Sequence, residues 1–315
     1  MEKYLAYLAI LAIGVAVGAS LAIAVNYISN SSSPEKHSVV FAVEMNDHSA
    51  AFWVAYDQGW FGQEGIDVVV KTFSTGLDLA IEMSRGDIDV ALVCIGPALV
   101  LRSRGVHVKL VSMTHLQGYA LVARPMYSSV EELSGKPVSV SGPGSPTWLL
   151  AKMVMDKYKV SFDLRKMPPF IAVNALLSGK VEAAFLPEHY VSLAESMDAR
   201  VLLRSQDLWP KMPGSGVLAK ENFLKEHPDL VEKIVKILSR ACDFINENFS
   251  DAAKIVAKRL ATDYGVMEKS MKYLNYTTEI DPDEIGEYID LLVKFGALEE
   301  PVSTEEFIDL EFIGG

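Results

Sequence analysis

The amino-acid sequence predicts an α/β fold made of two lobes behind an apolar N-terminal segment. Short apolar runs rich in β-forming residues alternate with amphipathic stretches, as strands and helices do in an α/β protein. This alternation restarts near the middle of the chain, and one strand motif occurs once in each half. The chain also opens with an uncharged apolar run. Together these observations predict two similar lobes that follow a membrane or export segment.

The uncharged run "YLAYLAILAIGVAVGASLAIAV" covers residues 4–25. It has about the length of a transmembrane helix, so residues 1–27 are expected to be a transmembrane anchor or a signal segment. An uncleaved anchor is preferred because the run is longer than a usual signal-peptide core. Lys3 is the only basic residue before it, which favours an N-in, C-out orientation. A Ser-rich flexible tether at 28–37 would then place the body outside the cell.

The composition is that of a folded globular chain without a nucleic-acid partner. Of the 315 residues, 50% are hydrophobic and 22% are charged, and the formal net charge is −12. The absence of a long Lys/Arg run argues against a nucleic-acid partner. Cys94 and Cys242 are too few for a disulfide framework. They are expected to be two buried thiols, with a single bridge as the alternative.

The first lobe is predicted from a regular alternation of strand and helix patterns. Leu77, Ala80 and Ile81 have the i, i+3, i+4 spacing of a helix face, and Gly86 follows as its stop. Pro97 stands in the first turn of the next helix, where proline is well tolerated. The predicted strands are 38–45, 66–73, 87–93, 108–113 and 118–124, and the predicted helices are 51–65, 76–86 and 97–105.

The second lobe begins near Ser128, where the pattern restarts. A glycine, a spacer, Ile or Val, an acid and small apolar residues occur in "RGDIDVALV" (85–93) and again in "SGKVEAAFL" (178–186). A separation of about ninety residues is too long for a solenoid repeat and fits equivalent strands of two lobes. The predicted elements are a short helix and a strand within 128–141, a Gly-rich turn and helix over 142–158, a helix at 172–179, a strand at 180–186, a helix at 187–197 and a strand at 199–205.

The C-terminal third is predicted to be almost entirely helical after one short strand within 211–220. Its longest helix, 227–249, has a single apolar stripe made of Leu230, Ile234, Ile237, Leu238 and Ala241. Two α/β lobes followed by helices suggest that the chain crosses back and finishes on the first lobe. The two crossings are expected to be hinges at 122–126 and 213–218.

The sequence holds no recognisable catalytic or metal-binding motif. It lacks His-Glu-x-x-His, Cys-x-x-Cys, P-loop and Gly-x-Ser-x-Gly motifs, and its six histidines are scattered. Neither an enzyme nor a bound metal or cofactor is therefore expected. The sequence has instead five strand-to-helix turns, and open α/β sheets bind ligands at such turns. Free N–H groups at the helix starts can hold a polar or anionic group.

These five turns supply the candidate ligand-binding residues. They are "EMNDHSAAF", "FSTGLDL", "VCIGPAL", "SGPGSPTW" and "FLPEHYV". The candidates in them are Asp47, His48, Ser74, Thr75, Gly76, Cys94, Ile95, Gly96, Ser145, Pro146, Thr147, Trp148, Glu188 and His189. The structural alternatives are helix caps for Ser74, Thr75, Ser145 and Thr147, a core position for Trp148, a buried filler for Cys94, and a solvated helix start or a lobe–lobe contact for Glu188 and His189.

Four stretches, read together, resemble the substrate-binding proteins of ABC importers: "VAYDQGWFGQEGIDVVV", "RGDIDVALVCIGPAL", "VEELSGKPVSV" and "LLSGKVEAAFLPEH". The most similar branch takes up nitrate, aliphatic sulfonates, taurine and thiamine-precursor pyrimidines. The resemblance spans about residues 38–203 and implies a periplasmic-binding-protein-like fold of type 2, in which two lobes joined by two strands close on a small ligand. It implies lobe 1 over 38–124 and 214–315, and lobe 2 over 125–213. It also implies that Thr75, Gly76, 94–96, 145–147 and Glu188 face the ligand.

The expected function is that of an extracytoplasmic solute-binding protein, held at the cell membrane by its N-terminal helix or secreted if that segment is cleaved. It would capture a small polar or weakly anionic solute of sulfonate, nitrate or pyrimidine type and deliver it to an ABC permease. A dianion is less expected because the turns contain no Arg. A monomer is expected. The alternatives are an enzyme of the pyrimidine-precursor or menaquinone-pathway type on the same fold, and a ligand-sensing module without transport.

Overall fold

The computed structural model describes residues 37–312. The anchor or signal segment expected at 1–27 lies outside the described residues, as does the expected tether up to residue 36. Between residues 37 and 312, no helix combines the length and the apolar composition that crossing a membrane requires.

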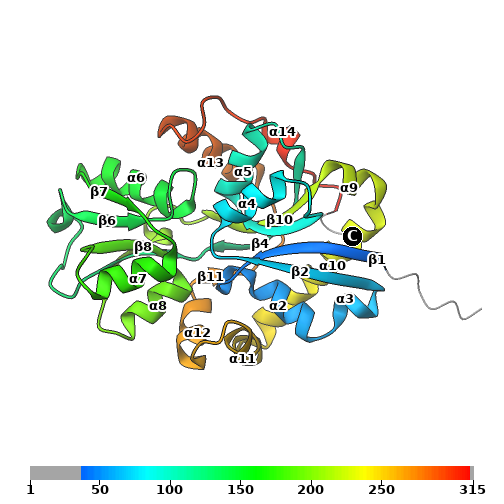
Figure 1. Cartoon of the computed structure of the whole chain (residues 1–315), viewed down its shortest axis with the longest axis horizontal. Coiled ribbons are helices and arrows are strands. Elements are labelled where there is room, and N and C mark those ends of the chain that lie inside the picture. The colour runs from blue at the N-terminus through cyan, green and yellow to red at the C-terminus, as the bar shows by residue number, and fades with distance from the viewer. Residues whose placement is uncertain (1–36, 313–315) are drawn as a thin grey trace, which may run out of the picture. The chain divides into compact units, whose positions relative to one another are not determined.

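Two β-sheets organise the described chain (Figure 1). The first has the strand order β11-β4-β10-β3-β1-β2, and the second has the order β7-β6-β8-β5-β9. The strands of the first sheet are β1 (His37–Glu44), β2 (Ile66–Phe73), β3 (Val90–Cys94), β4 (Val108–Gln117), β10 (Pro213–Lys220) and β11 (Leu274–Asn275). Those of the second are β5 (Tyr119–Ala123), β6 (Pro137–Val140), β7 (Asp163–Lys166), β8 (Ala183–Pro187) and β9 (Arg200–Arg204). We call each sheet with the helices that follow its strands lobe 1 and lobe 2, respectively.

The two sheets share one plan. In the first, β3 lies between the parallel β1 and the antiparallel β10. In the second, β8 lies between the parallel β6 and the antiparallel β5. The repeated motif therefore marks equivalent strands, as the sequence predicts. Both strands are buried along their whole length, which explains their continuous small-apolar sequences.

Helices cover both faces of each sheet (Figure 1). In lobe 2 they are η2 (Glu131–Leu133), α6 (Pro146–Tyr158), α7 (Pro169–Leu177), α8 (Glu188–Glu195) and η3 (Ser205–Asp207). In the N-terminal part of lobe 1 they are η1 (Asp47–Ser49), α2 (Ala50–Asp57), α3 (Trp60–Gln63), α4 (Gly76–Ser84) and α5 (Ile95–Ser103). The C-terminal helices are α9 (Glu221–Glu226), α10 (Pro228–Glu247), α11 (Phe249–Arg259), α12 (Tyr264–Met271), α13 (Pro282–Lys294) and α14 (Thr304–Phe307).

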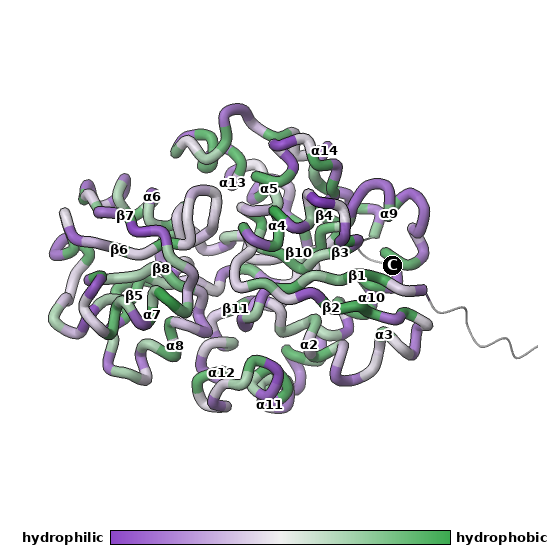
Figure 2. Tube along the Cα trace, in the orientation of Figure 1, coloured by the Kyte–Doolittle hydropathy of each residue, from purple (hydrophilic) through white to green (hydrophobic). Residues whose placement is uncertain are grey.

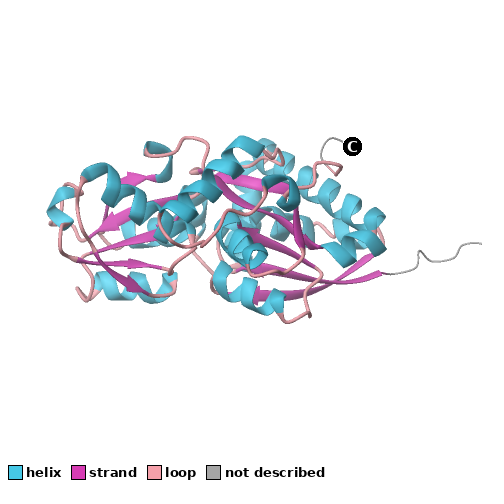
Figure 3. Ribbon diagram, turned by 90° about the horizontal axis from the view of Figure 1, so that it is seen from above, coloured by secondary structure: helices cyan, strands magenta, loops and turns pink. Residues whose placement is uncertain are grey.

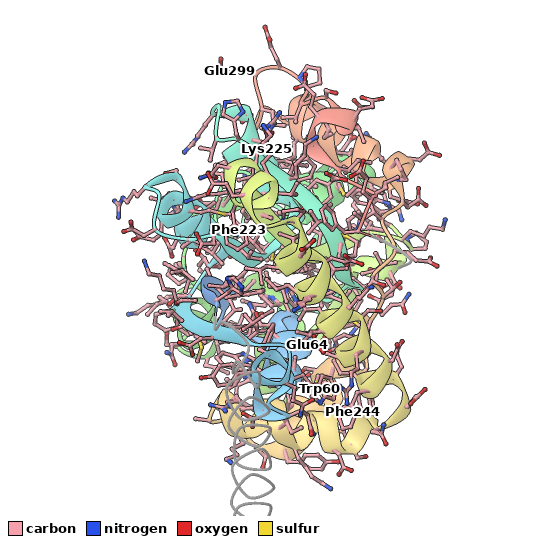
Figure 4. The ribbon with its side chains drawn as sticks, turned by 90° about the vertical axis from the view of Figure 1, so that its right-hand side faces the viewer. Trp60, Glu64, Phe223, Lys225, Phe244 and Glu299 are labelled. Atoms are coloured by element: carbon pink, nitrogen blue, oxygen red, sulfur yellow. The ribbon has the colours of Figure 1, made fainter. Side chains whose placement is uncertain are left out.

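The predicted apolar stripe of the long C-terminal helix is buried in α10. This helix packs on α2, α3 and β4. Figure 4 shows it running past Trp60, whose ring is 6.0 Å from that of Phe244. The Arg240 guanidinium, from the same helix, lies over the Trp60 ring in a cation–π contact, 4.0 Å from its centroid. The long helix thereby fixes α2 and α3 against the first sheet.

The apolar core continues from one lobe to the other. One buried cluster includes Val93 of β3 and Phe185 of β8, so the two sheets are joined by packed side chains as well as by the chain. Figure 2 shows β8 and β5 coloured as hydrophobic, whereas β7 at the edge of lobe 2 is hydrophilic. The charged sequence of β7, "DLRK", explains why this strand is missing from the sequence prediction.

The chain crosses between the sheets at two places, which Figure 3 shows as loops between the two groups of strands. The first crossing is very short, because β4 ends at Gln117 and β5 starts at Tyr119. Gln117 and Gly118 have positive φ angles of 69° and 96°. The second crossing runs from β9 through 205–212 to β10. The Gln117 N–H donates to the carbonyl oxygen of Met212 over 2.9 Å, so the two crossings are tied together.

The sheet pairing differs from the sequence prediction at the lobe boundary. β5 pairs with β8 and β9, so 118–124 belongs to the second sheet and the hinge expected at 122–126 is wrong. An apolar run identifies a strand but does not reveal its partner. The hinge expected at 213–218 is also wrong, because these residues lie inside β10. The C-terminal helices do not finish on lobe 1 alone, since α12 packs against α8 of lobe 2.

Candidate functional site

A small enclosed cavity lies where turns from both sheets meet. Its volume is about 20 Å³, which is room for about one water molecule. From lobe 1 it is lined by Glu44, Thr75, Gly76, Leu77, Cys94 and Pro97. From lobe 2 it is lined by Tyr119, Ser141, Ser145, Pro146, Thr147, Pro169 and Pro187. Most of these residues stand at the carboxyl ends of strands or at the first turns of helices, the usual ligand position in an open α/β sheet.

A larger hollow of about 670 Å³ lies along the edge strand β9, beside Arg204 and Tyr273. It is a shallow surface feature that none of the five predicted turns reaches. The enclosed cavity is therefore the better candidate site, although it is smaller.

Six of the fourteen predicted residues line the enclosed cavity: Thr75, Gly76, Cys94, Ser145, Pro146 and Thr147. The other eight do not. Ser74 is exposed, Ile95 and Trp148 are buried in the core, and Gly96 lies against the backbone of Gly144. Asp47, His48, Glu188 and His189 form a buried polar group beside the cavity. The direct role of all fourteen residues in ligand binding stays a prediction.

Glu44 is the one charged residue lining this cavity, among the described residues, and it is not among the predicted site residues. It ends β1, and its side chain is only 5% exposed. Its Oε1 accepts hydrogen bonds from the Cys94 thiol over 2.9 Å and from the Cys94 N–H over 3.3 Å, and its Oε2 accepts one from Asn46 over 3.4 Å. Burial raises the pKa of this carboxyl above its ordinary value, and these hydrogen bonds oppose the rise.

Gly76 lets the start of α4 approach this carboxylate closely. A Cβ at this position would lie 2.7 Å from Glu44 Oε1, which is too close for a side chain. The preceding residue, Thr75, is the N-cap of α4, and its hydroxyl accepts a hydrogen bond from the Asp78 N–H over 3.1 Å. The N-cap alternative for Thr75 is therefore confirmed, and the same residue lines the cavity.

The wall from lobe 2 is formed by the Gly-rich turn before α6. Ser145 is the N-cap of this helix and accepts a hydrogen bond from the Trp148 N–H over 3.2 Å. Its hydroxyl donates to the carbonyl oxygen of Gly142 over 2.7 Å. Thr147 lies inside the helix and accepts from the Ser141 N–H over 3.0 Å. The N-cap alternative is thus confirmed for Ser145 and wrong for Thr147.

Tyr119 connects the cavity to His48. The Tyr119 hydroxyl donates to Cys94 Sγ over 3.0 Å and lies 3.4 Å from His48 Nδ1. His48 Nε2 lies 3.0 Å from the carbonyl oxygen of Gly118, which can only accept, so this nitrogen carries the proton. Burial lowers the pKa of His48 to about 4 and raises the pKa of Cys94 well above its usual range. The ring is therefore neutral and the thiol protonated.

The four remaining predicted residues, Asp47, His48, Glu188 and His189, bring buried titratable side chains to the boundary between the lobes. Asp47 and Glu188 are fully buried, and Glu188 Oε1 accepts a hydrogen bond from Arg204 Nε over 2.9 Å. Neither oxygen of Asp47 has a hydrogen-bond partner of good geometry within the described part of the chain. The lobe–lobe contact considered for Glu188 and His189 fits this place, and a solvated helix start does not.

Both cysteines are free and buried, so the alternative of a single bridge is wrong. Across residues 37–312, no group of three or more His, Cys, Asp and Glu side chains is arranged to hold a metal ion.

Comparison with known proteins agrees with this architecture. Residues 32–261 match the NMT1-like family. A Bacillus subtilis protein provisionally named an aliphatic sulfonates-binding protein is 24% identical over 276 residues, which cover 82% of both chains.

Two solved structures show the same fold. The alkanesulfonate-binding protein SsuA from Xanthomonas axonopodis pv. citri, bound to MOPS, superposes with a TM-score of 0.79 at 16% identity and covers 88% of this chain and all of its own. The periplasmic nitrate-binding protein NrtA from Synechocystis PCC 6803 gives a TM-score of 0.80 at 13% identity and covers 89% and 88% of the two chains. The family match extends over more than half of the sequence, and the chain therefore belongs to the NMT1-like family, with the two-sheet fold of periplasmic solute-binding proteins.

Proposed function

We propose that this protein captures a small polar solute between its two lobes and delivers it to an ABC permease. The observation that carries the proposal is the enclosed cavity, to which strand-to-helix turns of both sheets contribute. Solved structures of the same fold include proteins named for alkanesulfonate and nitrate binding and a ligand-binding component of an ABC-type import system. Binding between two lobes favours the closed arrangement, because the solute makes all of its contacts only there.

The structure supports a closed arrangement of the cleft. The Tyr190 hydroxyl on α8 donates to the carbonyl oxygen of Met45 in lobe 1 over 3.4 Å, and Lys294 on α13 pairs with Asp156 on α6 over 2.7 Å. A cavity with room for one water cannot admit an organic solute. Entry therefore requires the lobes to separate, and the hinges that we propose are the crossings at 117–118 and 205–212.

We also propose that the body works outside the cell, held there by the N-terminal segment or released after cleavage. This part rests on the apolar sequence of residues 4–25 and on the periplasmic proteins that share the fold. Protease accessibility in intact cells measures it, since a body on the outer side is digested without lysis.

The test of solute capture is small-angle X-ray scattering of the full chain in mild detergent against a solute panel. The panel contains alkanesulfonates, nitrate, pyrimidines, amines and amidines. We expect at least one solute to reduce the radius of gyration and to raise Tm. If no solute produced compaction, solute capture would lose its support and a sensing or structural role would be favoured.

The competing proposal is an enzyme on the same fold. The groups around the cavity argue against nucleophilic chemistry, because the raised pKa of Cys94 keeps its thiol protonated and the nearby His48 is fixed by Gly118. Turnover of any solute that causes compaction would favour the enzyme, and mass spectrometry of the recovered solute measures it.

A further inference from the structure

We propose that the cavity between the lobes recognises its solute through a cationic N–H group, an amine or an amidine, which binds to the carboxylate of Glu44. This inference rests on the proposed function and names the class of solute. It departs from the weakly anionic solute that the sequence suggests.

Glu44 is the single charged side chain that lines the cavity, in the part of the chain that the structure describes. It takes part in no ion pair there, whereas the neighbouring buried Glu188 is paired with Arg204. A buried carboxylate without a cation is costly, and a cationic ligand would supply the missing partner. Cys94 and Asn46 donate hydrogen bonds to this carboxyl, which favour its charged form, and a bound cation would further offset the cost of its burial.

Four of the five hydroxyl groups around the cavity have already used their hydrogens. Thr75 donates to Asp78 over 2.7 Å, Ser145 donates to the Gly142 carbonyl, and Tyr119 donates to Cys94. Since the Ser145 hydrogen is engaged, Thr147 is the donor in the 3.1 Å contact between these two hydroxyls. Ser141 is the one lining hydroxyl that donates to no other described group. The oxygens of Thr75, Thr147 and Tyr119 therefore keep a lone pair for a ligand, whereas the Ser145 oxygen already accepts from the Trp148 N–H and from Thr147.

Prolines remove the backbone donors that an anion would need. Pro146 and Pro169 are the first residues of α6 and α7, Pro187 is the N-cap residue of α8, and Pro97 lies in the first turn of α5. All four line the cavity. Anion sites at helix starts depend on free N–H groups, and proline has none. The Cys94 N–H at the start of α5 is in turn directed at Glu44.

These three features select against an anion. An anion would meet the like charge of Glu44 and few free donors, whereas an amine or amidine would meet several acceptors. The apolar walls of Leu77 and the four prolines are suited to the hydrocarbon part of such a solute.

The test compares ions of matched shape and opposite charge on the full chain in mild detergent. Guanidinium and nitrate are both planar and threefold, and acetamidinium and acetate share one skeleton. Isothermal titration calorimetry at constant ionic strength gives each Kd. We expect each cation to bind at least about tenfold more tightly than its anionic counterpart, which corresponds to about 1.4 kcal/mol.

Two variants and a control locate the effect. Glu44→Gln keeps the shape of the side chain and should weaken acetamidinium binding at least tenfold, whereas Glu299→Gln, on the exposed loop labelled in Figure 4, should leave it unchanged. Pro146→Ala restores an N–H at the start of α6 and should strengthen nitrate binding.

The inference is overturned if nitrate or acetate binds more tightly than its cationic counterpart, or if Glu44→Gln leaves the Kd of acetamidinium unchanged. If Glu44→Gln does not fold, the comparison of matched ions on the natural chain decides alone. Compaction by an anion but not by a cation would overturn this inference and keep the proposed function. Absence of both binding and compaction would overturn both.

Discussion

Asp47 and Glu188 are acidic side chains that the fold buries at the boundary between the lobes. Burial, and then the nearby charge of Glu188, raises the pKa of Asp47 to about 8. Burial raises the pKa of Glu188 to about 7, although Arg204 acts in the opposite direction. Near neutral pH both carboxyls therefore hold protons to a large extent in the closed arrangement.

The stability of the protein is expected to fall as the pH rises from 6.5 to 8.5. The pKa values of both carboxyls lie above those of an unfolded chain, so the folded form binds more protons than the unfolded form. Its free energy of unfolding therefore decreases as the pH rises toward and through these pKa values of about 7 and about 8. His48 and His189, with pKa values of about 4, stay neutral over this range. Differential scanning calorimetry should show a decrease in Tm of about 2 °C or more, as expected for a change of about 1 kcal/mol.

Asp47→Asn should flatten this pH dependence, because the amide does not titrate. Glu299→Gln should keep the slope of the natural chain, since its side chain is exposed. An unchanged slope in Asp47→Asn would show that other groups cause the pH dependence.

At the scale of elements, α5 and the turn before α6 approach each other across the cleft. A Cβ at Gly96 would lie 2.3 Å from the carbonyl oxygen of Gly144 and 3.0 Å from the Tyr288 hydroxyl. Gly96 belongs to lobe 1 and Gly144 to lobe 2, so a side chain at Gly96 would obstruct closure of the lobes, and the Tyr288 hydroxyl on α13 would also have to shift slightly. This requirement explains a glycine within a helix, where it usually costs stability.

Gly96→Ala is expected to fold but to resist closure. Alanine favours a helix, which offsets the small shift that the Tyr288 hydroxyl has to make, so lobe 1 should still fold, while the methyl group blocks contact with Gly144. Small-angle scattering should show no compaction by solutes that compact the natural chain, and Kd should rise at least tenfold. Gly286→Ala, in α13, is the matched control and should behave as the natural chain, because its Cβ would meet only Thr304 Oγ1 at an ordinary distance of 3.8 Å. Full compaction of Gly96→Ala would show that the lobes can close without the close approach of residue 96 to Gly144.

The sequence is informative about elements and less so about their neighbours. The strand predicted at 66–73 coincides with β2, because it is bounded by a glycine and a hydroxylated turn. β5 was expected in the wrong sheet because its pairing is set by contacts distant in sequence. Tyr119 is not predicted because it lies in a strand, and Glu44 opens the first turn but ends a strand, so its orientation into the cavity does not follow from the sequence. An acid at the end of the apolar run "VVFAV" was the available signal for Glu44.

At the scale of the whole molecule, the Gln117 side chain ties the two crossings together. Its Nε2 donates to the carbonyl oxygens of Trp209 over 2.9 Å and of Pro210 over 2.5 Å. Gln117 is buried and has a positive φ angle, which few residues other than glycine adopt. These hydrogen bonds hold a strained short crossing against a longer one, and they limit how far the lobes rotate.

Gln117→Ala should widen the range of separations between the lobes. The loss of two buried hydrogen bonds should lower the free energy of unfolding by about 1–3 kcal/mol. It should also weaken solute binding, since the closed form becomes less populated. Spin labels at Val69 and Met197, exposed positions of lobe 1 and lobe 2, report the separation by double electron–electron resonance, because both native cysteines are buried and should not react. Gln58→Ala, at the exposed end of α2, is the control. An unchanged distance distribution in Gln117→Ala would place the restraint on lobe motion elsewhere, in the contact of α12 with α8.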